Sequence, residues 1–264
     1  MKRTLVCLMV VAACLAAESS WADPIQVPES GASYGDVGSW GVTWDGSGIP
    51  TDHSAFREIT DGDYTIRLAM RAHGRYAYLA GVYQDPSEPI YYVETGKYGG
   101  NDSDKDDKDY AKWNFDWYVA ISRTDATPNR YTVKLFYDFD PGTDTDEATH
   151  GWVSFAFPFQ YQPPQGPLVI VTTAQDSWNL GMPFLTTGGT SNGVTVTPPS
   201  ATFNPNVNGE YTFRLAVYKD SSDLGGVSIK VNAVPEPTSM VALSSLGLIG
   251  GVWGVVRRRK RSQV

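Results

Sequence analysis

Apolar and polar residues alternate along several segments in the middle of this 264-residue chain, and this period of two constrains the fold more than any other feature. The clearest segments are residues 64–70, 113–121, 131–139 and 211–217. Side chains of a β-strand point alternately to its two faces. The four segments therefore predict strands that bury one face and expose the other.

Shorter apolar runs add more strand candidates, and no stretch in the middle of the chain keeps a helical period. These candidates are residues 76–83, 90–95, 152–157, 167–172, 193–197 and 227–232. Glycine and proline separate the runs, as expected for turns. We therefore expect an all-β fold, an antiparallel β-sandwich or jelly-roll-like domain over residues 62–233, preceded by a loop-rich segment at residues 23–61.

Residues 1–22 have the features of a secretory signal peptide. Two basic residues precede an apolar stretch from Leu5 to Ala17, and small residues at Ser20 and Ala22 predict cleavage after Ala22. In an alternative interpretation, a lipobox ends at Cys14, which would then carry a lipid. Both cysteines of the chain lie in this segment, so we expect a mature protein without disulfides or a cysteine nucleophile.

The C-terminal segment, residues 234–264, combines three parts in a defined order. A Val-Pro-Glu-Pro stretch is followed by 19 residues without formal charge and then by a basic cluster. A helix over residues 238–256 would span roughly 28 Å, close to the ~30 Å hydrocarbon core of a bilayer. Because basic clusters stay on the cytoplasmic side, we expect one transmembrane helix with the acidic domain outside. The basic membrane stop consists of Arg257, Arg258, Arg259, Lys260 and Arg261.

This order of parts resembles the PEP-CTERM sorting signal of Gram-negative bacteria. The motif residues are Val234, Pro235, Glu236 and Pro237, and the resemblance covers residues 234–264 only. In that family the signal is read by exosortase, a membrane-embedded cysteine enzyme that cuts near the Pro-Glu-Pro. The resemblance implies exosortase and the secretion machinery as partners. It also implies an inner-membrane-anchored precursor that later reaches the cell surface or the medium.

The same C-terminal motif is known on some ice-binding proteins. Ice binding usually requires a flat array of regularly spaced threonines. The Thr-rich stretch at residues 186–202 keeps no steady period, which disfavours this function.

Charge limits the range of partners. The formal net charge of the whole chain is −8. Residues 1–22 contribute +1 and residues 235–264 contribute +4, so residues 23–234 have a net charge of −13. A domain this acidic repels phosphate backbones, so we expect no nucleic-acid partner. Divalent cations or a hydrated polymer matrix, such as an exopolysaccharide, suit the charge better.

One acidic loop offers candidate calcium ligands. Residues 137–151 contain a Pro-Gly turn and several carboxylates, the hard oxygen ligands that Ca²⁺ prefers. The alternative interpretation is a hairpin loop with solvated carboxylates. A second acidic stretch, residues 101–109, departs from the EF-hand pattern at two required positions and predicts an ordinary loop. The calcium candidates are Asp138, Asp140, Asp144 and Asp146.

Tryptophans in turn-rich segments are candidates for stacking on sugar rings. They are Trp40, Trp44 and Trp178, whereas Trp113 and Trp117 follow the strand pattern and are expected in the core.

Catalytic residues are not predicted. Gly189–Gly193 match G-x-S-x-G but lack the strand before and the helix after that a nucleophile elbow needs. His53, His73 and His150 lie far apart in sequence and are interpreted as surface or strand-end histidines.

These features together predict an exported protein of the cell envelope or extracellular matrix, associated with exopolysaccharide or biofilm. Its role would be structural or interactive and not enzymatic. A carbohydrate- or calcium-binding β-sandwich module is the alternative, and an ice-binding protein or a hydrolase fits the sequence less well. We predict no cofactor apart from Ca²⁺ in the alternative function.

Overall fold

The computed structural model describes residues 24–46, 48–75, 82–99, 110–122, 127–161 and 166–235. Strands dominate these residues, which confirms the expected all-β fold. None of the helices in this part of the chain is long and apolar enough to cross a bilayer. The predicted signal peptide with Ala22, the transmembrane helix and the basic cluster at residues 257–261 lie outside the described residues.

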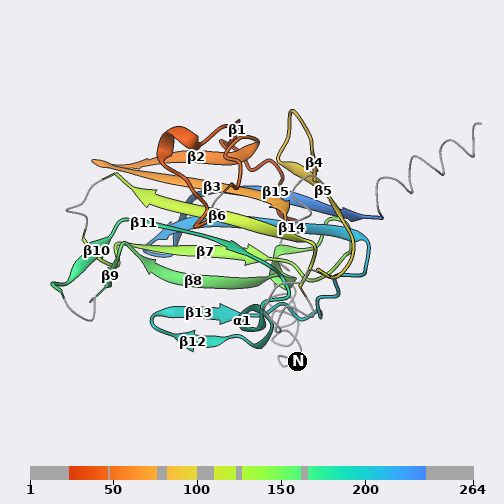
Figure 1. Ribbon diagram of the computed structural model, residues 1–264. Coiled ribbons are helices and arrows are strands. Elements are labelled where there is room, and N and C mark those ends of the chain that lie inside the picture. The colour runs from red at the N-terminus through yellow and green to blue at the C-terminus, as the bar shows by residue number, and fades with distance from the viewer. Residues whose placement is uncertain are drawn as a thin grey trace, which may run out of the picture.

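Two sheets contain most of the strands (Figure 1). The five-stranded sheet has the order β1 (Ser33–Gly35), β2 (Ser54–Asp61), β3 (Tyr64–Gly74), β6 (Trp113–Ile121), β11 (Thr173–Trp178). The eight-stranded sheet has the order β12 (Gly189–Ser191), β13 (Val194–Thr197), β8 (Gly151–Phe157), β7 (Tyr131–Tyr137), β14 (Gly209–Lys219), β15 (Ser222–Val234), β5 (Ile90–Glu94), β4 (Tyr83–Gln84).

The remaining elements are short. They are a separate hairpin of β9 (Phe159–Tyr161) and β10 (Val169–Val171), the helix α1 (Pro183–Thr187), and 3₁₀ turns at Gly38–Trp40 and Glu147–Thr149. Neighbouring strands in the sheets pair antiparallel except β5 and β15, which pair in parallel. The expectation of a purely antiparallel domain is therefore wrong at this pair.

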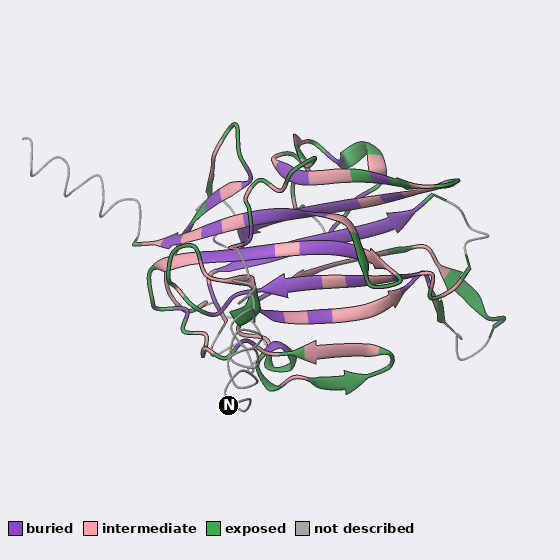
Figure 2. Ribbon diagram, turned by 180° about the vertical axis from the view of Figure 1, so that it is seen from behind, coloured by how far each residue is buried: buried purple, intermediate pink, exposed green. Residues whose placement is uncertain are grey.

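The two sheets face each other across one apolar core. Their long strands run in roughly the same direction (Figure 1), as in aligned packing of twisted sheets. Phe115 of β6 stacks on Phe213 of β14 with ring centroids 4.5 Å apart, and Trp113 lies 5.7 Å from Tyr211. Burial is concentrated on these long strands (Figure 2). Trp113 and Trp117 are buried, which confirms their expected place in the core.

The strands predicted from alternation are confirmed as β3, β6, β7 and β14. The shorter candidates contain β5, β8, β10, β13 and part of β15, and only the end of the candidate at residues 76–83 is described, where β4 begins. Residues 62–70 and 209–217 are identical at six of nine positions, and they fall on β3 and β14, which belong to different sheets.

The segment expected to be loop-rich, residues 23–61, contributes two strands. Ser54–Asp61 forms β2, which pairs with β3 from Ala55 to Asp61, so the expectation is wrong for this stretch. Residues 36–46 and 48–53, called here the covering loop, pack on the outward face of the five-stranded sheet. Val37, Val42 and Trp44 of this loop contact the small or aromatic side chains of Ala69, Tyr118 and Ala120. The outward face of β3 and β6 is therefore buried as well.

Candidate functional site

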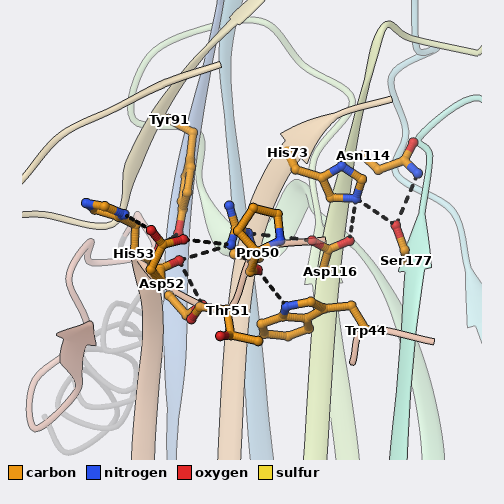
Figure 3. Close-up of polar contacts among 12 residues, drawn as sticks. Trp44, Pro50, Thr51, Asp52, His53, His73, Tyr91, Asn114, Asp116 and Ser177 are labelled. Atoms are coloured by element: carbon orange, nitrogen blue, oxygen red, sulfur yellow. Dashed lines mark hydrogen bonds and ion pairs between the residues drawn. The ribbon is translucent and has the colours of Figure 1, made fainter. Parts of the chain in front are cut away.

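A polar cluster lies beneath the covering loop, where β3, β6 and β11 meet (Figure 3). Asp116 is fully buried, and its carboxylate lies 3.1 Å from Nε2 of His73 and 3.9 Å from Nε of Arg71. Arg71 donates to the carbonyl oxygens of Pro50 and Asp52. The cluster thus ties the covering loop to the sheet with charge-assisted hydrogen bonds.

Ser177, His73 and Asp116 lie within contact of one another, but their geometry differs from that of a nucleophile triad. A triad needs the carboxylate at one imidazole nitrogen and the hydroxyl at the other. Here Ser177 Oγ lies 3.2 Å from Nε2 of His73, the same nitrogen that faces Asp116. Nδ1 lies 2.8 Å from the carbonyl oxygen of Gly74. The arrangement fits a structural polar network.

The protonation of His73 follows from its neighbours. Burial disfavours the charged imidazolium, but the carboxylate of Asp116 and the carbonyl oxygen of Gly74 together outweigh burial and raise the pKa of His73. His73 lies near the end of β3 and His150 directly before β8, which agrees with the strand-end interpretation, and both are buried.

A groove of about 560 Å³ opens on the outward face of the eight-stranded sheet. Phe136 of β7 and Trp152 of β8 lie directly opposite each other in the strand register and contribute two aromatic rings. The other lining residues come from the segment before β8 and from the end of β13 with the loop that follows it: Glu147, Ala148, Thr149, His150, Thr197, Pro198 and Ser200. The groove therefore combines aromatic rings, hydroxyl groups and one carboxylate.

The loop at residues 146–150 is held firmly in place. Asp146 caps the 3₁₀ turn by accepting a hydrogen bond of 2.9 Å from the backbone N–H of Ala148. His150 lies 2.9 Å from the carbonyl oxygen of Asp146 through Nδ1 and 2.7 Å from Oγ1 of Thr212 through Nε2. These contacts fix the position of Glu147 beside the aromatic rings.

A second hollow of about 410 Å³ adjoins the groove, because Glu147 lines both. The N-terminal part of the described chain, residues 24–30, crosses β14 and β15 here. Arg214 donates two hydrogen bonds of 2.9 Å to the carboxylate of Glu29 and one of 2.7 Å to Asp223. Ser228 donates to the carbonyl oxygen of Gln26. The chain that follows the predicted cleavage site is thus docked on the sheet.

The calcium candidates mostly close local turns. The carboxylate of Asp138 accepts from the N–H of Asp140, and that of Asp140 accepts from the N–H of Gly142. Asp146 caps the 3₁₀ turn, while the N–H of Asp144 donates to Glu210. Among the described residues no group of three or more histidine, cysteine, aspartate or glutamate side chains is arranged to hold a metal ion. Calcium binding stays a prediction.

The three tryptophan candidates differ in exposure. Trp44 is fully buried and donates from Nε1 to the carbonyl oxygen of Pro50 at 3.0 Å, so its expected exposure is wrong. It anchors the covering loop. Trp40 is half-buried, with its ring centroid 5.4 Å from that of Phe56. Trp178 is half-buried and has ring centroids 5.1 Å from those of Trp117 and Phe184. Sequence reasoning missed Trp152 as a candidate, because alternation does not show whether an outward residue lines a groove.

The C-terminal motif begins where β15 leaves the sheet. β15 lies between β14 and β5, and Val234 is its last residue, paired with Glu94. The N–H of Thr95 donates to the carbonyl oxygen of Val234 at 2.9 Å. Pro235 follows directly and is exposed. Glu236 and Pro237 lie outside the described residues.

Comparison with known proteins identifies this segment. Residues 233–260 match the family model of the PEP-CTERM protein-sorting motif, which confirms the resemblance seen in the sequence. No curated protein and no solved structure is significantly similar to the chain. The motif indicates an exported protein that is processed at the membrane through recognition by exosortase.

Proposed function

We propose that this chain is a protein of the cell surface or extracellular matrix that exosortase releases from the inner membrane, with a structural or interaction role and no enzymatic activity. The observation that carries the proposal is the direct continuation of β15 into the sorting motif. The two facing sheets also support the assignment of the domain to the β-sandwiches.

The short connection has a mechanical consequence. Val234 is held in the sheet, and the uncharged run begins at Thr238, so only residues 235–237 connect the two. Three extended residues span at most roughly 11 Å. A precursor with this tail in the bilayer would hold its folded domain against the membrane surface. Cleavage near the Pro-Glu-Pro would then free an intact domain, because the cut falls outside β15.

Composition supports an extracellular destination. Residues 23–264 contain no cysteine, so folding there needs no disulfide formation. The charge of −13 on residues 23–234 keeps the domain soluble and suits a hydrated matrix.

Fractionation of cells with and without their exosortase gene tests this proposal. With exosortase, we expect a shortened protein at the cell surface or in the medium. Without it, we expect the full-length chain in the inner-membrane fraction, with its domain accessible to protease only from the periplasmic side. The double variant Pro235→Ala/Pro237→Ala should behave like the exosortase deletion, and Ser239→Ala, in the same tail, should behave like the wild type. A wild-type chain that stays in the cytoplasm with residues 1–22 uncut would contradict the proposal.

Carbohydrate binding is the second candidate function, and the groove beside Trp152 favours it. Aromatic rings next to hydroxyl and carboxylate groups match the apolar face and polar rim of a sugar. A glycan array with and without EDTA tests this candidate and its calcium dependence together. Flat binding across the array and an unchanged melting temperature would exclude it.

A further inference from the structure

We propose that the groove and the adjoining hollow around Glu147 form one binding site for a neutral polysaccharide chain, with Trp152 as its stacking platform. This inference rests on the proposed extracellular interaction role and names the ligand class and the side chains that would bind it.

The shape of the site favours a chain over a single sugar. The two hollows have volumes of about 560 and 410 Å³, and each is within the range of about 300–1,000 Å³ typical of ligand sites. Glu147 lines both, so the two hollows adjoin at this residue. A linear oligosaccharide could therefore occupy the groove and extend toward residues 24–30.

The chemistry of the lining matches a carbohydrate. A pyranose ring presents an apolar face of C–H groups, which packs on an aromatic ring, and a rim of hydroxyl groups. Trp152 is half-buried, and within the described residues its indole N–H has no hydrogen-bond partner. The same is true of the carboxylate of Glu147 and the hydroxyl groups of Thr197 and Ser200. These groups can exchange hydrogen bonds with sugar hydroxyls.

The site is preformed. The loop with Glu147 is fixed by Asp146 and His150, as described above. On the other side, the backbone of Gly151 packs so closely on Pro199 that an added Cβ would lie 2.4 Å from Pro199 Cδ. This contact fixes the loop that follows Thr197 and carries Ser200. Preorganisation lowers the entropic cost of binding.

Charge favours a neutral ligand. Residues 23–234 have a net charge of −13, and Glu147 places one of these carboxylates at the centre of the site. Arg214, the cation of the second hollow, is already paired with Glu29 and Asp223. Lys134 lies beside the groove, with Nζ 5.3 Å from the ring centroid of Trp152 and 5.2 Å from that of Tyr218. One lysine does not compensate this excess of acid, so polyanions such as acidic polysaccharides are repelled.

Isothermal titration calorimetry on the full chain tests the inference, in a detergent whose headgroup is not a sugar. The probes are neutral hexasaccharides of β-1,4-glucose, β-1,3-glucose, mannose and galactose, with an alginate hexamer as the acidic comparison. We expect at least one neutral probe to bind and the alginate hexamer not to bind. Trp152→Ala should weaken binding about tenfold or more, and Glu147→Gln should also weaken it.

Tyr83→Ala is the matched aromatic control. Tyr83 is 64% exposed at the edge of the same sheet, so its removal should leave both folding and binding unchanged. Ser200→Arg fills the groove from an exposed position and should abolish binding even where Trp152→Ala fails to fold.

Three results would overturn the inference: no binding of any neutral probe by the folded protein, undiminished binding by Ser200→Arg, or an equal loss in Tyr83→Ala. Failure of this test is distinct from failure of the proposed export, because binding by purified protein does not depend on processing. Correct processing with no neutral-sugar binding would remove only the site.

Discussion

The position of β15 makes a sharp prediction about where the chain can be shortened. A chain that ends after Pro235 keeps all of β15, whereas one that ends after Gly226 loses Val227, Ile229 and Val231, each 0% exposed. Burying such a side chain contributes about 1.5–3 kcal/mol. The three together contribute roughly 5–9 kcal/mol, comparable to the ~5–15 kcal/mol that stabilises a typical domain. The shorter chain also loses all of the pairing of β15 with β5 and the pairing with β14 from Val227 onward.

Thermal unfolding followed by near-ultraviolet circular dichroism measures this difference, because the core is rich in aromatic rings. We expect a cooperative transition for the chain ending after Pro235 and none for the chain ending after Gly226. Ile229→Ala in the longer chain should give an intermediate result, with unfolding free energy lower by about 2–5 kcal/mol. A cooperative transition in the chain ending after Gly226 would refute the assignment of β15 as an essential strand of the core.

Three further predictions concern the core and two polar clusters. Phe213→Ala removes a ring between the two sheets and should lower the free energy of unfolding by about 3–5 kcal/mol in urea titrations. A loss under about 1 kcal/mol would contradict the packing of the two sheets against each other at this ring. Hydrogen bonds from Lys219 and then Tyr131 lower the pKa of Asp61 from 3.8 to about 2, so its stabilisation is present above pH 3.8 and is lost as the pH falls toward 2. Asp61→Asn should remove that part of the acid dependence, and an unchanged acid profile would contradict it. Burial lowers the pKa of His73 and the contact with Asp116 raises it, with a net rise above 6.5. The contact therefore stabilises the fold below pH 6.5, and this stabilisation is lost as the pH rises through the raised pKa. His73→Asn should flatten this dependence of the unfolding free energy on pH, and an unaltered dependence would count against the His73–Asp116 contact.

Alternation predicted the strands whose two faces differ in polarity. β3, β6, β7 and β14 follow this pattern because one face of each lines the core between the sheets. β11, with the sequence TAQDSW, has no such pattern. It lies at the edge of its sheet, and its Gln175 accepts hydrogen bonds from the backbone of the covering loop. A strand selected for polar contacts cannot be recognised by an apolar period.

The outward face of β3 and β6 shows a second limit. Arg71, His73 and Asp116 alternate with apolar residues, so the sequence places them on a solvent-facing side, and yet all three are buried under the covering loop. The sequence alone does not show whether a polar side chain forms its hydrogen bonds within a buried network or with water. Only the position of Trp44 and its loop distinguishes the two cases, and that position depends on contacts distant in sequence.

The sorting motif was predictable because its parts are consecutive in the chain, and the groove was not because its parts converge from separate strands. Phe136 and Trp152 come together through the pairing of β7 with β8, and Thr197 joins them through the pairing of β8 with β13. No spacing in the sequence encodes this arrangement.

The intact mass of the processed protein tests the central claim most directly. β15 ends at Val234, and the sorting motif starts there, so exosortase should leave the whole strand on the exported domain. Mass spectrometry of protein from the cell surface or medium should give a C-terminus between Val234 and Thr238, and this species should be missing from cells without exosortase. A C-terminus before Ala233, or the same mass in both strains, would contradict the account.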